Sequence, residues 1–182
     1  MNKVIAKVPI WAYTLILMAV CAVASLFSSM ATAELLVSYG FSSTAATVLY
    51  VVLIGAAYGG IARLLMRIVY SIGDRLFFRF TRAVPDYNFR RLPVKYNEFV
   101  RTVLFWLIIA KLIEALFNTL LTYVYPVGYY LWQFISALVT LACLIAAYFM
   151  MDRAYVPTWQ SGKCFLALAI PVGIIYAVSV IL

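Results

Sequence analysis

The stretch that most constrains the fold carries two opposite charges in the middle of an apolar run. Lys111 and Glu114 lie near the centre of residues 96–125, which read as one long helix. An α-helix rises about 1.5 Å per residue, so the part from Val103 to Val124 spans a hydrocarbon layer about 30 Å thick. A lone charge at that depth costs roughly 2.5–3.5 kcal/mol. The charged side of this helix must therefore be covered by protein or water.

The composition of the chain indicates an integral membrane protein. Of its 182 residues, 67% are apolar and 11% are charged, and the mean hydropathy is +1.04. Soluble domains are about 45–50% apolar and about 25% charged. Segments of alternating polarity that build membrane barrels are absent. Helices satisfy their own backbone hydrogen bonds within a bilayer, so we predict an all-α integral membrane protein.

Five apolar segments are long enough to cross a membrane. We predict one membrane domain over residues 1–182, a bundle of five transmembrane helices with spans at about 8–33, 44–62, 101–124, 130–151 and 164–182. The first segment has a basic start and an Ala31-Thr32-Ala33 sequence, as in a signal peptide. Its apolar run exceeds the roughly 7–15 residues of a signal core. We therefore expect it to be retained as a span.

A basic segment, residues 63–82, follows the second span. Half of its helical wheel carries the arginines, which are Arg63, Arg67, Arg75, Arg79 and Arg82. We predict an amphipathic interfacial helix on the cytoplasmic side, with a break expected at Gly73, whose basic face meets anionic lipid headgroups or a protein partner. A cytoplasmic extension of the second span explains the same pattern equally well. Pro85 and Pro93 predict a loop at 83–95.

The positions of the fourteen Lys and Arg residues predict the orientation. Two precede the first span, nine lie between Arg63 and Arg101, and two lie between Arg153 and Lys163. Lys and Arg concentrate on the cytoplasmic side of membrane proteins. We therefore expect a multi-pass protein of the cytoplasmic (inner) membrane, with its amino terminus in the cytoplasm and its carboxyl terminus outside.

Two sets of side chains are candidates for a site within the membrane. The first is a polar face shared by the third and fourth spans, which a turn near Pro126 places antiparallel; its members are Lys111, Glu114, Asn118, Gln133, Ser136 and Thr140. The second consists of two small-xxx-small pairs, Gly55 with Gly59 and Ala56 with Gly60. Such pairs let two helix backbones approach closely, and we expect packing inside the bundle more than between copies.

The side chains present exclude several kinds of chemistry. The chain has no His, and Cys21, Cys143 and Cys164 stand alone in or beside apolar runs as expected free thiols. Common zinc, haem and His-based catalytic sites are thereby excluded, and P-loop, GxSxG and HExxH motifs are missing. We expect no enzyme activity, no catalytic residue, no metal and no cofactor. No nucleic-acid-binding motif accompanies the arginines, so we expect no nucleic-acid partner.

Two non-enzymatic functions remain. In the first, the chain is an accessory, assembly or scaffold subunit of a membrane complex, and the polar face is a structural lock or docks against other membrane subunits or a second copy. In the second, the chain is a small transporter or channel component that binds or passes a polar solute or proton along Lys111 and Glu114. We favour the first function, because five spans leave few walls for a pathway and paired broken helices are absent.

Overall fold

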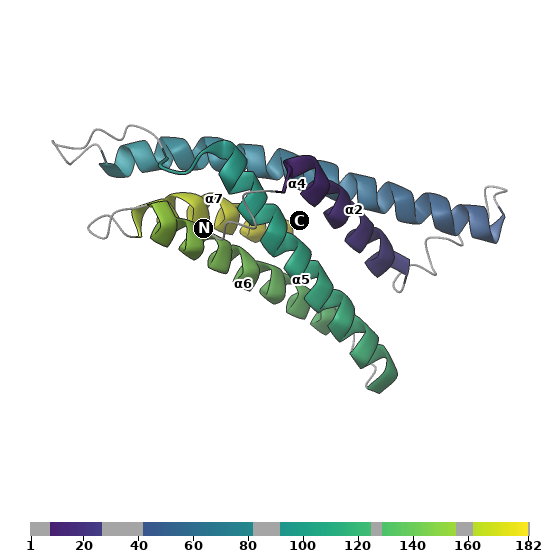
Figure 1. Ribbon diagram of the computed structural model, residues 1–182. Helices are drawn as coiled ribbons and strands as arrows, with labels where there is room; N and C mark the ends of the chain where they lie inside the picture. Colours follow the sequence, from purple (N-terminus) through teal and green to yellow (C-terminus); the bar gives the residue numbers. More distant parts are fainter. Residues whose placement is uncertain (1–7, 27–41, 82–91, 125–128, 156–161, 182) are drawn as a thin grey trace.

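Five α-helices make up the part of the chain that the structure, a computed structural model, describes: residues 8–26, 42–81, 92–124, 129–155 and 162–181 (Figure 1). They are α2 (Ile10–Leu26), α4 (Ser43–Thr81), α5 (Tyr96–Val124), α6 (Tyr129–Tyr155) and α7 (Lys163–Ile181). The all-α prediction is confirmed. Within the described residues, α4 and α6 are long and apolar enough to cross a membrane, while α2 and α7 contain shorter apolar stretches.

The longest helix, α4, joins two segments that the sequence analysis had separated. It runs for 39 residues without a break. Its first turn is capped by Ser42, whose hydroxyl accepts a hydrogen bond from the Ala45 amide at 3.3 Å. The prediction of a separate amphipathic helix is therefore wrong, and residues 63–81 extend the second predicted span. Of the predicted loop, residues 92–95 are non-helical and residues 83–91 lie outside the described residues.

Gly73 does not break α4, because it has a packing role within the helix. A Cβ atom at Gly73 would lie 3.1 Å from the Ala167 carbonyl oxygen and 2.9 Å from the Leu168 side chain. The missing side chain therefore admits the backbone of α7. Gly is about 1 kcal/mol less favourable than Ala inside a helix. Here the contact with α7 offsets that cost.

Helices α2 and α7 pack along different halves of α4 (Figure 1). The amino-terminal half receives α2, since a Cβ atom on Gly55 would lie 2.8 Å from the Met18 carbonyl oxygen. The carboxyl-terminal half receives α7 at Gly73. In a simple bundle of five helices of equal length, α2 and α7 would contact the same part of α4. Here the long helix α4 instead contacts two shorter helices at different positions along its length.

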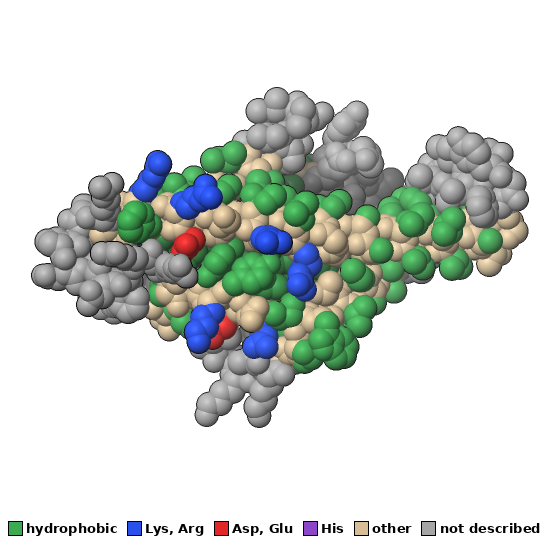
Figure 2. Space-filling view, turned by 90° about the horizontal axis from the view of Figure 1, so that it is seen from above, with side chains coloured by type: hydrophobic (Ala, Val, Ile, Leu, Met, Phe, Trp, Pro, Cys, Tyr) green, Lys and Arg blue, Asp and Glu red, His purple; other side chains and the backbone are tan. Residues whose placement is uncertain are grey.

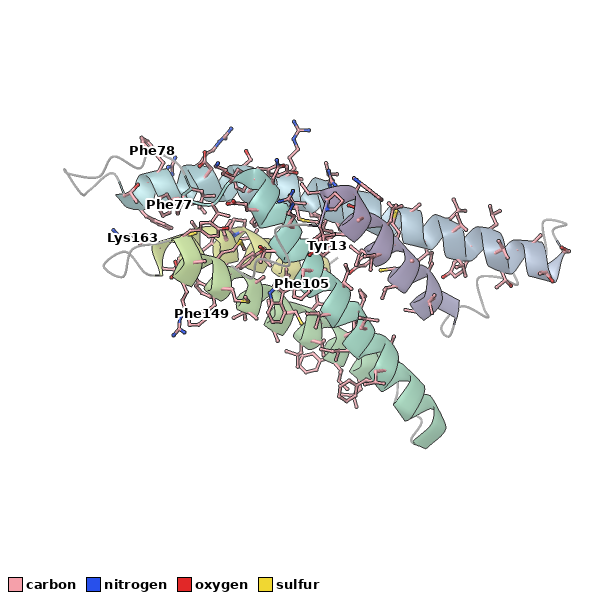
Figure 3. All side chains as sticks on the ribbon, in the orientation of Figure 1. Tyr13, Phe77, Phe78, Phe105, Phe149 and Lys163 are labelled. Carbon is pink, nitrogen blue, oxygen red and sulfur yellow. The ribbon has the colours of Figure 1, made fainter. Side chains whose placement is uncertain are left out.

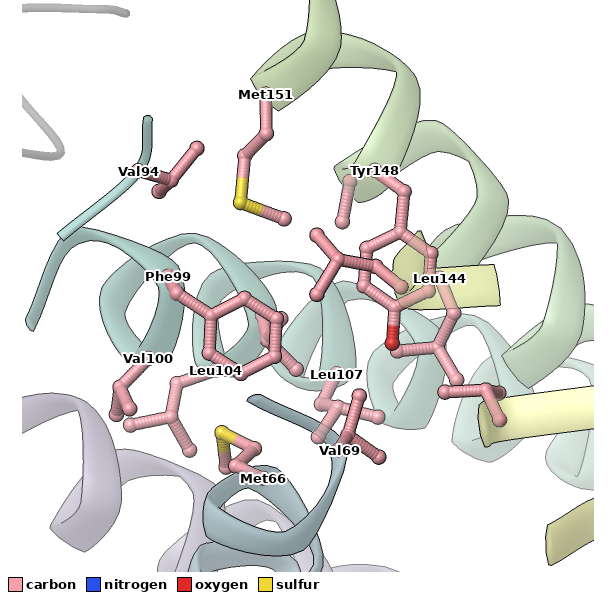
Figure 4. Close-up of a cluster of buried hydrophobic side chains, with 14 of the residues drawn as sticks. Met66, Val69, Val94, Phe99, Val100, Leu104, Leu107, Leu144, Tyr148 and Met151 are labelled. Carbon is pink, nitrogen blue, oxygen red and sulfur yellow. The ribbon is translucent and has the colours of Figure 1, made fainter. Parts of the chain in front are cut away.

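Helices α5 and α6 form an antiparallel hairpin that packs on α2 and α7. Within the hairpin, the rings of Phe99 and Tyr148 stack with centroids 6.4 Å apart and planes at 10° (Figure 4). Met66 and Val69 bring α4 into the same buried cluster (Figure 4). Closely packed apolar side chains attract one another through many small van der Waals contacts. This cluster therefore holds α4, α5 and α6 together.

Aromatic side chains also mark the α2–α5 contact and the two sides of α4. The ring of Tyr13 meets the ring of Phe105 edge to face, with centroids 6.5 Å apart (Figure 3). Phe77 is fully buried, whereas its neighbour Phe78 points away from the bundle (Figure 3). Successive helical residues lie about 100° apart, so neighbouring positions have different environments.

Side chains of α4 and α6 form hydrogen bonds with the segments that lead into α5 and α7. The Asp74 carboxylate accepts a hydrogen bond from the Leu92 amide at 2.8 Å, and the Tyr70 hydroxyl donates one to the Val94 carbonyl at 2.9 Å. The Asp152 carboxylate of α6 accepts hydrogen bonds from the amides of Gly162 and Phe165, at 2.8 and 3.3 Å. These amides lie at the amino-terminal end of α7, so a side chain from another helix caps α7. The negative carboxylate also interacts favourably with the positive end of the α7 dipole.

The glycine contacts in α4 generate a matched pair of variants. Gly55→Ala places a Cβ atom against the Met18 backbone, and we expect a loss of about 1–3 kcal/mol, as for overpacked cores. Gly60→Ala is the control, because a Cβ atom there meets nothing within 4 Å. The measurement is the unfolding midpoint of the purified protein in detergent. Equal midpoints for the two variants would contradict the α2–α4 packing.

The cap on α7 generates a second prediction. Asp152→Ala removes the acceptor of two amides, and we expect a loss of about 0.5–2 kcal/mol, as for other helix caps. Asp152→Asn keeps one side-chain oxygen and is expected to protect only one of the two amides. Amide hydrogen exchange of the first turn of α7 measures the effect. Unchanged exchange in Asp152→Ala would show that the carboxylate does not protect these amides.

Candidate functional site

A largely buried ion pair within α5 is bonded to a side chain of α6. The Lys111 Nζ atom lies 2.6 Å from Glu114 Oε2, one turn along the same helix. The other carboxylate oxygen, Oε1, accepts a hydrogen bond from the Thr140 hydroxyl at 2.8 Å. Glu114 and Thr140 are both buried. Glu114 therefore binds a cation on its own helix and a hydroxyl on the next, which sets the register of the α5–α6 hairpin.

The cation of the pair also faces an aromatic ring of α4. The Lys111 Nζ atom lies 4.9 Å from the centroid of the Tyr58 ring. A cation above an aromatic face gains about 0.5–2 kcal/mol, with the larger value where water is excluded. The pair therefore lies where α4, α5 and α6 meet.

The structure brings together part of the predicted polar face. Lys111, Glu114 and Thr140 form one bonded group. Ser136 is half-buried one turn away on α6, and within the described residues no hydrogen bond links it to this group. The side chains of Asn118 and Gln133 lie outside the described part of the structure. Tyr58 was missed, because no pattern in the sequence connects an aromatic residue on α4 with a lysine 53 positions later.

The geometry explains how two charges are accommodated among apolar helices. Removing an ion from water costs several kcal/mol even after the protein relaxes. Here an opposite charge, a hydroxyl donor and an aromatic face replace the lost water contacts. A hydrogen bond to a charged group contributes about 1.5–3 kcal/mol. Each charge thus has protein partners, and the group joins α4, α5 and α6.

An apolar cavity of about 210 Å³ lies beside this polar group, between α4, α5, α6 and α7. Tyr58 and Thr140 line its wall and also contact the ion pair. The rest of its wall includes Val103 and Leu144, and none of the described residues that line it is charged. An apolar cavity of about 150 Å³ in another protein stays dry and binds benzene. This larger cavity suits a hydrocarbon group and offers a polar solute little compensation.

The basic face of α4 is only partly free. The guanidinium group of Arg63 donates a hydrogen bond to the Thr14 hydroxyl of α2 at 3.2 Å. Arg67, Arg75 and Arg79 are exposed, and Arg82 lies outside the described residues. Figure 2 shows Lys and Arg side chains gathered over one part of the molecule, with none over its extended end. The extended end is the uncharged amino-terminal half of α4.

The two small-residue pairs face different surroundings. Gly55 and Gly59 are buried against α2, where a Cβ atom on Gly59 would lie 2.6 Å from the Met18 side chain. Ala56 and Gly60 are exposed, with open space beside Gly60. The first pair is therefore in contact with α2 of the same chain. The second pair is an open groove on the outer side of α4.

The three cysteines are buried free thiols. Among the described residues, no group of three or more Cys, Asp or Glu side chains is placed to hold a metal ion. Asp74 and Asp152 bind backbone amides, as described above. The comparisons with known proteins found no matching family model, curated protein or solved structure.

The ion pair generates a third prediction. Glu114→Gln leaves the Lys111 cation buried without its counter-charge, and we expect a loss of about 3–5 kcal/mol, as for other broken buried pairs. The double variant Lys111→Met with Glu114→Leu removes both charges, and we expect it to recover most of the stability. Unfolding midpoints in detergent at one pH measure both variants. A double variant as unstable as Glu114→Gln would contradict a purely structural lock.

Proposed function

We propose that the chain is a non-enzymatic accessory, assembly or scaffold subunit of a membrane complex. The proposal includes five membrane spans in a cytoplasmic (inner) membrane, an amino terminus in the cytoplasm and a carboxyl terminus outside. Its partners are other membrane subunits or further copies of the chain, and anionic lipids meet its basic cytoplasmic side. The observation that carries it is the open apolar side of the amino-terminal half of α4.

Apart from its contact with α2, this half of α4 is largely exposed. In the most apolar stretch of the helix, only 17% of the residues are buried. Val48 and Val52 are each 59% exposed, and the groove at Ala56 and Gly60 is open beside them. In a bilayer, helices associate through small residues that allow close packing. The surface therefore suits a transmembrane helix of another subunit.

The polar group supports the same function. Lys111, Glu114 and Thr140 bind one another, and Tyr58 covers the cation. A pathway for a polar solute needs donors and acceptors that line a wet channel. The adjoining cavity is instead lined by apolar side chains. The buried charges thus serve the packing of the chain itself, which leaves the outer face of α4 for partners.

The experiment that tests this function is native mass spectrometry of the tagged protein, extracted from its own membrane in mild detergent. We expect a second chain, or a second copy, in a fixed ratio. The double variant Ala56→Leu with Gly60→Leu fills the groove, and overpacking of about 1–3 kcal/mol predicts association weakened by about tenfold or more.

Ala142→Leu is the matched control, because Ala142 is an exposed apolar position on another helix. We expect it to keep the companion chain. A wild-type protein that is always a monomer would overturn the subunit function. Equal loss of the companion from both variants would contradict the groove as the interface.

A further inference from the structure

We draw no further inference here: the strongest candidate, the apolar cavity of about 210 Å³ between α4, α5, α6 and α7, carries none because nothing in the described part of the structure shows what fills it.

Discussion

The close approach of two helices to the backbone of α4 is the constraint on which the rest of the structure depends. At Gly55, the backbone of α2 occupies the space of a side chain, and at Gly73 the backbone of α7 does the same. Because these glycines lie eighteen residues apart, the two contacts require one long unbroken helix. They also place α2 and α7 on different halves of it (Figure 1). The α5–α6 hairpin then packs against α2 and α7.

The ion pair specifies the register of the helices that surround it. Apolar contacts between α5 and α6 would specify this register less strictly, because they are less directional than hydrogen bonds. A buried carboxylate that needs both a cation and a hydroxyl is satisfied in one register only. Tyr58 adds the position of α4 to that register through its ring. Two charges thus specify how three helices meet.

The surfaces of α4 divide between internal and external roles along its length. Its Gly55 and Gly59 side is occupied by α2, while the Ala56 and Gly60 side is open, which suits a partner helix. Farther along, α4 presents exposed isoleucines and then exposed arginines.

Apolar periodicity and composition were enough to predict the all-α fold and the approximate positions of the helices, because a helix is specified by local sequence. The spacing of Lys111, Glu114 and Thr140 also indicated a shared polar face. The continuity of α4 was not predictable, since the fate of Gly73 depends on α7, almost a hundred residues later. The same holds for Tyr58 and the cavity, which arise where helices distant in sequence meet. Local patterns therefore determined which residues are helical and where polar side chains lie on each helix. Only tertiary packing decided which glycines contact another helix, which side chains cover the charges and which face of α4 is exposed, because these contacts join residues distant in sequence.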